Sequence, residues 1–138
     1  LVVTAAIMID QGRVLITRRR EGASQGLKWE FPGGKVEDGE DPESCIVREI
    51  KEEINIDIEV DRIYKAVLHR YGDRSIVLLA YLCRHVGGRP VPLACSSIRW
   101  VPVTELMDFD LAAADIPIAG KLREDFGNDN ATEGKTNL

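Results

Sequence analysis

Apolar residues at the start of the chain fall into two runs of strand length. The ranges 1–9 and 13–17 are dominated by Val, Ile, Leu, Ala and Thr, and the sequence Asp10-Gln11-Gly12 separates them. Short apolar runs that are bounded by turn residues are typical of β-strands. We therefore expect a tight β-hairpin at the N-terminus.

A helical pattern occupies the range 42–54. Asp41 is a favourable N-cap, and Pro42 suits the first helical position because an N–H would have no partner there. Asn55 tolerates the left-handed conformation in which many helices end. We expect one apolar stripe on the buried side of this helix. It consists of Ile46, Val47, Ile50 and Ile54.

The second half of the chain predicts further strands. The range 56–68 alternates in part and is typical of one strand or two, whereas 74–86 is the most strand-like run of the chain. Gly72-Asp73 between them indicates a hairpin turn. A short strand is expected over 98–101.

Two further helical segments are expected after these strands. Thr104 can cap a short helical turn that ends at Met107. Asp115 can cap a final helix with Pro117 in its first turn, and this helix should end near Phe126.

This order of strands, helix, strands and helix predicts a mixed α/β (α+β) fold in one domain over residues 1–126. The range 127–138 is polar and is expected to form a mobile tail. At 138 residues the chain is long enough to bury a sizeable hydrophobic core.

Composition and charge narrow the class of protein. The net charge of −5 argues against a nucleic-acid polymer as partner, because binding one depends on Lys and Arg that replace its counterions. A single nucleotide that arrives with Mg²⁺ is compatible with this charge. The three cysteines are widely spaced and form no metal or disulfide pattern, so we expect a cytoplasmic protein. No apolar run reaches membrane-spanning length and no signal-peptide pattern opens the chain. We expect a monomer or a homodimer without a membrane partner.

Three glutamates share one face of the predicted helix. Glu49, Glu52 and Glu53 stand at positions i, i+3 and i+4, where side chains are neighbours. Their like charges repel, so a purely structural helix gains nothing from this arrangement. A hard divalent cation explains it, because Mg²⁺ takes oxygen ligands. A solvated acidic face is the alternative, and it leaves the residues around the helix unexplained.

A motif of fixed spacing surrounds these glutamates. It consists of Gly34, Glu40, Arg48, Glu49, Ile50, Glu52, Glu53 and Ile56. Random residues would match its Gly, Arg and Glu positions on the order of once per ten million starting points. The motif resembles the Nudix box, the signature of hydrolases that split a diphosphate linked to another moiety. The chain departs from the box at Asn55, where the family usually has Gly, and this change is chemically mild.

The resemblance extends beyond the box to the MutT subfamily and covers residues 1 to about 125. It is carried by Ile16-Thr17-Arg18-Arg19, by Lys28-Trp29-Glu30-Phe31-Pro32-Gly33-Gly34-Lys35, by Trp100-Val101-Pro102 and by the range 110–118. It implies a mixed β-sheet sandwiched between helices. MutT members hydrolyse nucleoside triphosphates to monophosphate and pyrophosphate, and several remove oxidised nucleotides such as 8-oxo-dGTP. The range 110–117 is closer to the CTP pyrophosphohydrolase branch of these enzymes.

The resemblance also implies roles at a metal site. Glu49, Glu52 and Glu53, together with the carbonyl of Gly33, match ligands of Mg²⁺, for which Mn²⁺ is a possible substitute. Arg48 is expected to orient these carboxylates through a bidentate pair. One of Glu52 and Glu53 is expected to take a proton from water.

Phosphate contacts are implied at two positions. Arg19 matches a phosphate-contacting arginine, although a solvated strand end explains Arg18-Arg19-Arg20 equally well. Lys35 follows the glycines and faces either the phosphates or solvent.

Base contacts are implied at two more positions. Phe31 matches an aromatic residue that packs on the nucleobase, and a core position is the alternative. Asp115 matches a position where an Asn reads the base. An ionised Asp only accepts hydrogen bonds, so it favours an amino group, as on cytosine or 2-hydroxyadenine. The O6 edge of 8-oxoguanine would require Asp115 to be protonated or the base to bind in a different pose.

One departure concerns catalysis. Ala94 stands where MutT-like proteins carry a Glu, and the range 87–100 holds no carboxylate. Either Glu52 or Glu53 activates the water, or a metal-bound hydroxide suffices, or turnover is slow. Two other functions stay open: a Nudix hydrolase of a nucleoside diphosphate conjugate such as ADP-ribose, and a nucleotide-sensing module.

Overall fold

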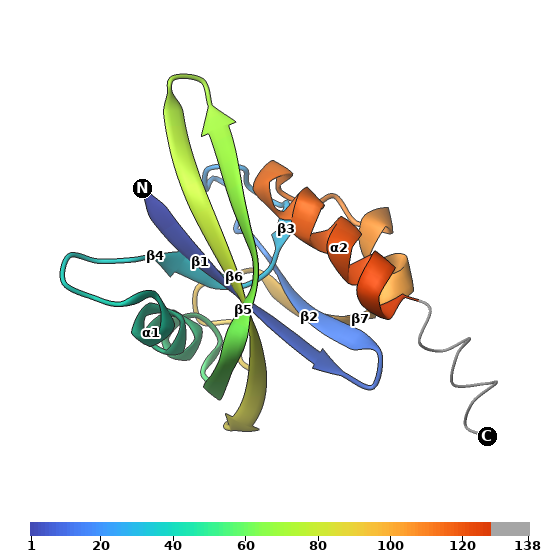
Figure 1. The fold of residues 1–138 in the computed structure, drawn as a ribbon. Coiled ribbons are helices and arrows are strands. Elements are labelled where there is room, and N and C mark those ends of the chain that lie inside the picture. The colour runs from blue at the N-terminus through green and yellow to red at the C-terminus, as the bar shows by residue number, and fades with distance from the viewer. Residues whose placement is uncertain (128–138) are drawn as a thin grey trace.

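The structure is a computed structural model that describes residues 1–127. Its strands form a mixed sheet between two α-helices that lie on opposite faces (Figure 1), so the predicted fold class is confirmed. In chain order the elements are β1 (Val2–Asp10), β2 (Arg13–Arg18), β3 (Trp29–Glu30), β4 (Gly33–Lys35), α1 (Pro42–Ile54), β5 (Asp57–Tyr71), β6 (Arg74–Gly87), β7 (Ser97–Pro102), the 3₁₀ turns η1 (Val103–Asp108) and η2 (Ala113–Asp115), and α2 (Ile116–Phe126).

The strand β1 lies at the centre of the sheet. It pairs in parallel with β6 and antiparallel with β2 and β4. The path through the sheet is β3-β2-β1-β6-β5, and β7 joins β2. The hairpin of β5 and β6 projects beyond the other strands at the top of Figure 1. Because β4 pairs with β1, it brings Gly33 and Gly34 to the middle of the fold.

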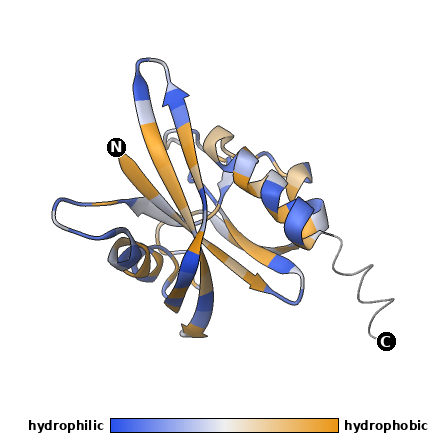
Figure 2. Cartoon of the chain, viewed as in Figure 1, coloured by the Kyte–Doolittle hydropathy of each residue, from blue (hydrophilic) through white to orange (hydrophobic). Residues whose placement is uncertain are grey.

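Alternate side chains of β1 supply two separate hydrophobic cores. Ala5 and Ile7 pack in the core beneath α2, whereas Ala6 and Met8 pack in the core beneath α1. Successive side chains of a strand point to opposite faces, which explains this division. Full burial of one large aliphatic side chain stabilises a fold by roughly 1.5–3 kcal/mol. Figure 2 shows apolar strands in the middle of the fold and polar residues on the outward sides of the helices.

Both predicted ends of α1 are confirmed. The Asp41 carboxylate accepts a hydrogen bond from the Ser44 amide at 2.8 Å, and Pro42 opens the helix. Asn55 is left-handed, with φ of 65°, and its amide donates to the Lys51 carbonyl. Helix ends depend on residues that are close in sequence, so the sequence alone is enough to locate them.

The predicted apolar stripe of α1 is wrong at one position. Val47 is 41% exposed, whereas Cys45 is fully buried. Val47 lies one helical turn from Glu43 and from Lys51, so it belongs to the polar side of the helix. The Cys45 thiol instead lies against the backbone of β4, 3.3 Å from the Lys35 carbonyl.

The predicted strands are confirmed, and β5 is one continuous strand. Three register shifts interrupt its pairing with β6, which is why its sequence alternates only in part. Gly72, with φ of 62°, forms the predicted turn between the two strands.

Two predicted helix caps are wrong. Thr104 lies inside η1, which begins at Val103 and has no side-chain cap. Asp115 does precede α2, but its side chain makes no capping bond. Asp115 is instead buried, with only 5% of its surface exposed.

Neither α-helix among the described residues is long and apolar enough to cross a membrane. The predicted C-terminal tail lies outside the described residues, except for Gly127.

Candidate active site

Arg48 connects the glutamates of α1 through a network of ion pairs. It donates to both oxygens of Glu40, at 2.7 Å from Nε and 2.9 Å from Nη2. Its Nη1 donates to Glu49 at 3.0 Å and to Glu52 at 3.1 Å. The bonds from Arg48, and a further bond from the Glu37 amide, lower the pKa of Glu40 to about 2. The bidentate partner of Arg48 is therefore Glu40, and the glutamates of α1 receive single bonds.

Glu53 is the buried glutamate of this cluster. Its Oε1 makes no hydrogen bond to any described residue. Burial, and then the charges of Glu30 and Glu49, raise the pKa of Glu53 to about 8. The Gly33 amide and Arg19 oppose this shift without cancelling it. A buried carboxyl group in this situation requires either a proton or a cation.

Two glycines bring the backbone of β4 against this cluster. A Cβ atom on Gly34 would overlap the carboxyl group of Glu49. A Cβ atom on Gly33 would overlap the carbonyl of Thr4 in β1. Only glycine permits so close an approach, so both residues are required by packing.

The donors of the cluster suit a hard divalent cation. Carboxylate oxygens are the ligands that Mg²⁺ prefers, and Glu53 Oε1 makes no hydrogen bond to a described residue and is therefore available as a metal ligand. Among residues 1–127, however, no three acidic, His or Cys side chains already surround a common point. Glu53 lies near Glu49 and Glu30, whereas the Glu52 side chain is 62% exposed. The structure therefore groups two of the three predicted glutamates closely and leaves the third at the rim.

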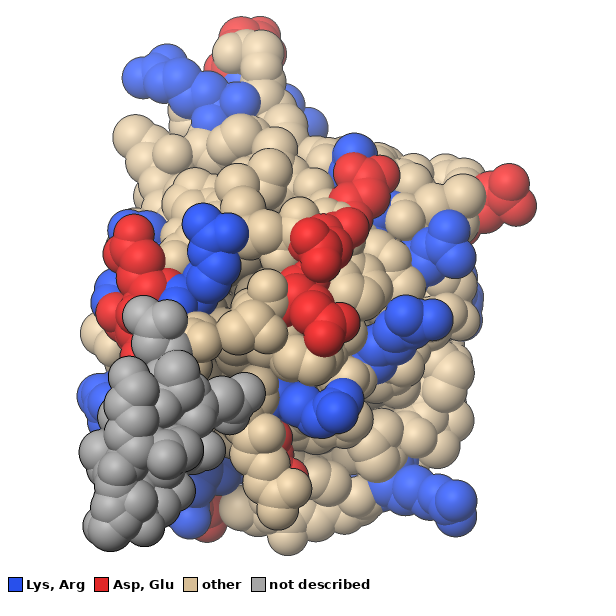
Figure 3. All heavy atoms as spheres, turned by 90° about the vertical axis from the view of Figure 1, so that its right-hand side faces the viewer, with Lys and Arg blue, Asp and Glu red and all other residues tan. Residues whose placement is uncertain are grey.

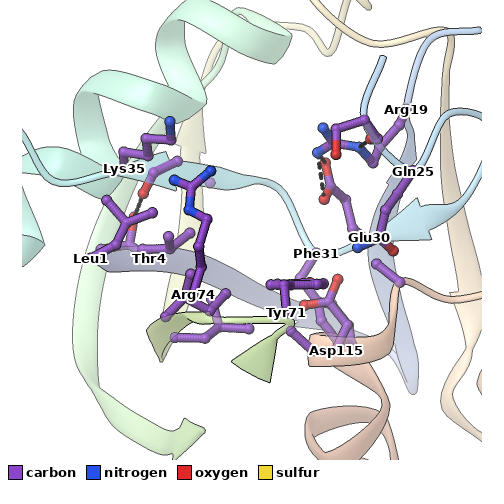
Figure 4. Close-up of a pocket in the computed structure, with 18 residues that line it drawn as sticks. Leu1, Thr4, Arg19, Gln25, Glu30, Phe31, Lys35, Tyr71, Arg74 and Asp115 are labelled. Atoms are coloured by element: carbon purple, nitrogen blue, oxygen red, sulfur yellow. Dashed lines mark hydrogen bonds and ion pairs between the residues drawn. The ribbon is translucent and has the colours of Figure 1, made fainter. Parts of the chain in front are cut away.

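A cavity of about 590 Å³ lies beside the glycines (Figure 4). On one side Arg19 Nη1 donates to both oxygens of Glu30, at 3.1 and 3.2 Å. On the other side are Lys35 and Arg74, which make no ion pair within the described part of the chain. The cavity therefore has charged groups on both sides and apolar walls between them. Five predicted site residues line it, namely Arg19, Phe31, Gly33, Lys35 and Asp115.

Asp115 lies in the wall of this cavity. Burial, and then the charge of Glu30, raise the pKa of Asp115 well above its usual range, against the effect of the Phe31 amide. Burial therefore favours the protonated form of Asp115, which can both donate and accept a hydrogen bond. The ionised state that we assumed from the sequence is not the state that burial favours. Phe31 is 3% exposed and belongs to both the core and the cavity wall.

The sequence analysis missed several residues of the cavity. Glu30 appeared only as part of a family motif, yet it pairs with Arg19 and lies near Glu53 and Asp115. Its position three residues before Gly33, in a short strand that leads to the glycines, was the available signal. Tyr71 and Arg74 lie at the tip of the β5–β6 hairpin, and no local pattern connects this tip with the glycines.

The segment that contains Ala94 is attached to the end of α1. The amides of Leu93 and Ala94 donate to the Glu53 carbonyl at 2.9 and 3.2 Å. Arg20 donates to the Leu93 carbonyl at 2.7 Å. A side chain longer than alanine at position 94 would therefore start close to the glutamate cluster.

Comparison with known proteins defines the family. The model of the NUDIX domain matches residues 1–122, so the chain belongs to the Nudix family. It is 32% identical to an 8-oxo-dGTP diphosphatase of Escherichia coli K12 over 83% of the chain and 88% of that protein. It is also 32% identical to a CTP pyrophosphohydrolase of the same organism, over 84% and 86%.

Solved structures agree with this assignment. The solution structure of the E. coli ORF135 protein has a TM-score of 0.79 at 31% identity, over 88% of this chain and 89% of that one. The NMR structure of MutT from methicillin-resistant Staphylococcus aureus 252 has a TM-score of 0.72 at 34% identity, over 91% and 98%. The chain is thus a Nudix hydrolase of the MutT type.

Proposed function

We propose that the chain is a Mg²⁺-dependent nucleoside triphosphate pyrophosphohydrolase that acts on modified or oxidised nucleotides. The products are a nucleoside monophosphate and pyrophosphate. One observation carries this proposal: a cavity with the buried carboxyl group of Asp115 in its wall lies beside Gly33 and Gly34, and Gly34 contacts Glu49 of the glutamate cluster.

The cavity supports a nucleotide as the substrate. Phe31 and the alanines before α2 offer apolar surface for a base, and Asp115 offers a donor and an acceptor. A neutral Asp115 is compatible with the O6 edge of 8-oxoguanine, which an ionised one would repel. Because burial favours the protonated form, we favour 8-oxo-dGTP and keep CTP or a modified dCTP as the second candidate. The names of the two relatives from E. coli are consistent with both.

The glutamate cluster supports a divalent metal. Glu49, Glu52, Glu53 and the Gly33 carbonyl would hold Mg²⁺ or, as a substitute, Mn²⁺. When bound, the metal neutralises the triphosphate and favours attack on it. A cation beside Glu53 would also lower the pKa of this residue, so that it could ionise at neutral pH.

The remaining groups support attack of water at the β-phosphorus. Glu53 takes the proton from water as the new phosphorus–oxygen bond forms. The bond from the β-phosphorus to the oxygen bridging to the α-phosphorus breaks, and the monophosphate leaves. Arg48 keeps Glu49 and Glu52 in place, and Arg19 and Lys35 contact the phosphates.

The proposed partner is a small nucleotide. On the face of the molecule seen in Figure 3, Asp and Glu form a row near the middle and separate Lys and Arg lie around it, which differs from the continuous basic surface that nucleic-acid polymers bind. We also propose that the protein is cytoplasmic and that it is a monomer or a homodimer.

A substrate panel with Mg²⁺ tests the proposal. It consists of 8-oxo-dGTP, dGTP, GTP, CTP, dCTP and ADP-ribose, and the products are identified as pyrophosphate or orthophosphate. In H₂¹⁸O we expect the label in pyrophosphate, because water attacks the β-phosphorus. Glu53→Gln should lower kcat by about a hundredfold or more, because it cannot accept the proton. Glu43→Gln removes a carboxylate from the other end of α1 and serves as the matched control.

Three outcomes would contradict the proposal. Preference for ADP-ribose would support hydrolysis of a diphosphate conjugate. Tight nucleotide binding without turnover would support a sensing module, consistent with Ala94. Label in the monophosphate would move the attack to the α-phosphorus.

A further inference from the structure

Gln25 lies in a loop that is fixed in place at the mouth of the cavity. This loop joins β2 to β3. Arg19 Nε donates to the Ser24 carbonyl at 2.6 Å, and Arg18 Nε donates to the Leu27 carbonyl at 3.2 Å. The backbone amide of Leu27 also donates to the Arg19 carbonyl at 2.9 Å. The position of Gln25 is therefore determined by bonds on both sides of it.

The side chain of Gln25 enters the cavity and has no partner there. Figure 4 shows Gln25 on the side of the cavity where Arg19 and Glu30 lie, with Asp115 in the adjoining wall. Within residues 1–127 the amide makes no hydrogen bond, so its donor and its acceptor are both available. The backbone of Gln25 is left-handed, with φ of 54°, which is unfavourable for residues other than Gly and Asn.

Glu30 and Asp115 supply only part of the bonds that a base edge can make. Both oxygens of Glu30 accept from Arg19, so the pair is already satisfied. Asp115 presents one carboxyl group from the wall of the cavity. A purine or pyrimidine edge presents several adjacent donors and acceptors, so reading it requires a second group beside Asp115.

We infer that Gln25 is a specificity-determining residue, and that its amide binds the polar edge of the base together with Asp115. This inference rests on the proposed function and extends it, because it names a residue that chooses among bases. Sites that hydrogen-bond a substrate discriminate strongly against analogues that leave the bond unmade.

Three substitutions test the inference. Gln25→Leu keeps a similar size and removes both hydrogen-bonding groups. Gln25→Glu keeps the length and, when ionised, removes the donor. Gln25→Asn keeps an amide and suits the left-handed backbone, but it is shorter by one methylene. Gln11→Leu is the matched control, because Gln11 also has φ of 54° but lies in the β1–β2 turn, outside the cavity.

The measurement is kcat/KM for 8-oxo-dGTP, dGTP, GTP, CTP and dCTP, with thermal unfolding of every variant. We expect Gln25→Leu to lower kcat/KM for the best substrate by about tenfold or more and to reduce its advantage over the others. Gln25→Glu should change the order of bases, and Gln11→Leu should leave kcat/KM and the order unchanged. If Gln25→Leu unfolds, Gln25→Asn answers the same question through the length of its side chain.

Unchanged base ratios in every folded Gln25 variant would overturn the inference and leave the proposed function standing. A change confined to the ratio of GTP to dGTP would also overturn it, because Gln25 would then contact the sugar. If the unsubstituted protein hydrolyses none of these nucleotides, the proposed function fails and this inference fails with it.

Discussion

The protonation state of Asp115 decides which base edges the cavity can accept. Its pKa is raised well above the usual range because the carboxyl group is buried near Glu30. A neutral carboxyl group offers a donor and an acceptor, as an Asn side chain does, whereas the ionised form offers acceptors only.

A pH series therefore gives a prediction for Asp115. Below the pKa of Asp115, Asp115→Asn should leave the order of 8-oxo-dGTP, dGTP, CTP and dCTP unchanged. As the pH rises through the pKa of Asp115, the original protein should move toward cytosine nucleotides, because the carboxylate can then only accept from an amino group. The Asn variant should show no such movement. The ratio of kcat/KM for 8-oxo-dGTP to that for dCTP, measured from about pH 6 to pH 10, is the test.

If this ratio changed with pH in the same way in the original protein and in the Asn variant, Asp115 would not read the base. The same result would be expected if Gln25 or Arg74 alone supplied the contacts.

At the scale of elements, the contact between β4 and α1 positions the glutamate cluster. The carboxyl group of Glu49 lies against Gly34, where a Cβ atom would overlap it. Gly34→Ala should therefore displace Glu49 and lower kcat by at least about tenfold, because ligand geometry is lost. We expect the circular dichroism spectrum to stay the same, since Glu49 is partly exposed and can move.

Gly120→Ala is the control for Gly34→Ala. A Cβ atom on Gly120 would contact nothing within 4 Å. Gly120 lies inside α2, where alanine is favoured over glycine by roughly 0.5–1 kcal/mol. This variant should be fully active and slightly more stable. Equal activity of both variants would mean that Glu49 need not stay in place.

The elements show where sequence patterns are sufficient and where they are not. The ends of α1 follow from Asp41 and Asn55, because capping uses atoms only a few residues away. The failed caps at Thr104 and Asp115 show the limit of this logic. Asp115 has the right residue type at the right position, yet its side chain is buried instead of capping α2.

The site as a whole was predictable only in part. The glutamates of α1 were recognisable because they lie on one helix face. Glu30, Gln25 and Arg74 come from a strand, a loop and a hairpin that meet only after folding. No spacing in the sequence links these three residues, so their convergence depends on the sheet topology.

At the scale of the whole molecule, four carboxyl groups that are buried fully or in part share one pH dependence. Burial raises the pKa of Glu30, Glu49, Glu53 and Asp115, with Glu53 at about 8. The folded protein therefore binds these protons more tightly than the unfolded chain, whose carboxyl groups titrate near pH 4.5. Their contribution to stability is complete below about pH 4.5 and is lost as the pH rises toward 8.

This loss of stability with rising pH leads to a prediction for the metal-free protein. In EDTA, Tm should fall between about pH 5.5 and pH 8, and added Mg²⁺ should raise Tm more at pH 8, where it replaces the proton on Glu53. Glu53→Gln should flatten the pH dependence by on the order of 1–3 kcal/mol in the free energy of unfolding. Calorimetry of both proteins at the two pH values is the measurement. If Mg²⁺ raised Tm equally at both pH values, the metal would not bind at these carboxyl groups.

The parallel pairing of β1 with β6 has a consequence for the synthesis of the protein. Val2 lies beside Val77 and Met8 beside Cys83, so β1 leaves the ribosome long before its parallel partner β6 has been made. Contacts of such large sequence separation must overcome the entropy of closing a long loop and form slowly. A nascent chain that ends before β6 already contains every glutamate of α1 and still lacks β6 and β7, two of the seven strands of the sheet. A pause in translation at that stage would therefore expose the apolar sides of β1 and α1 to other nascent chains.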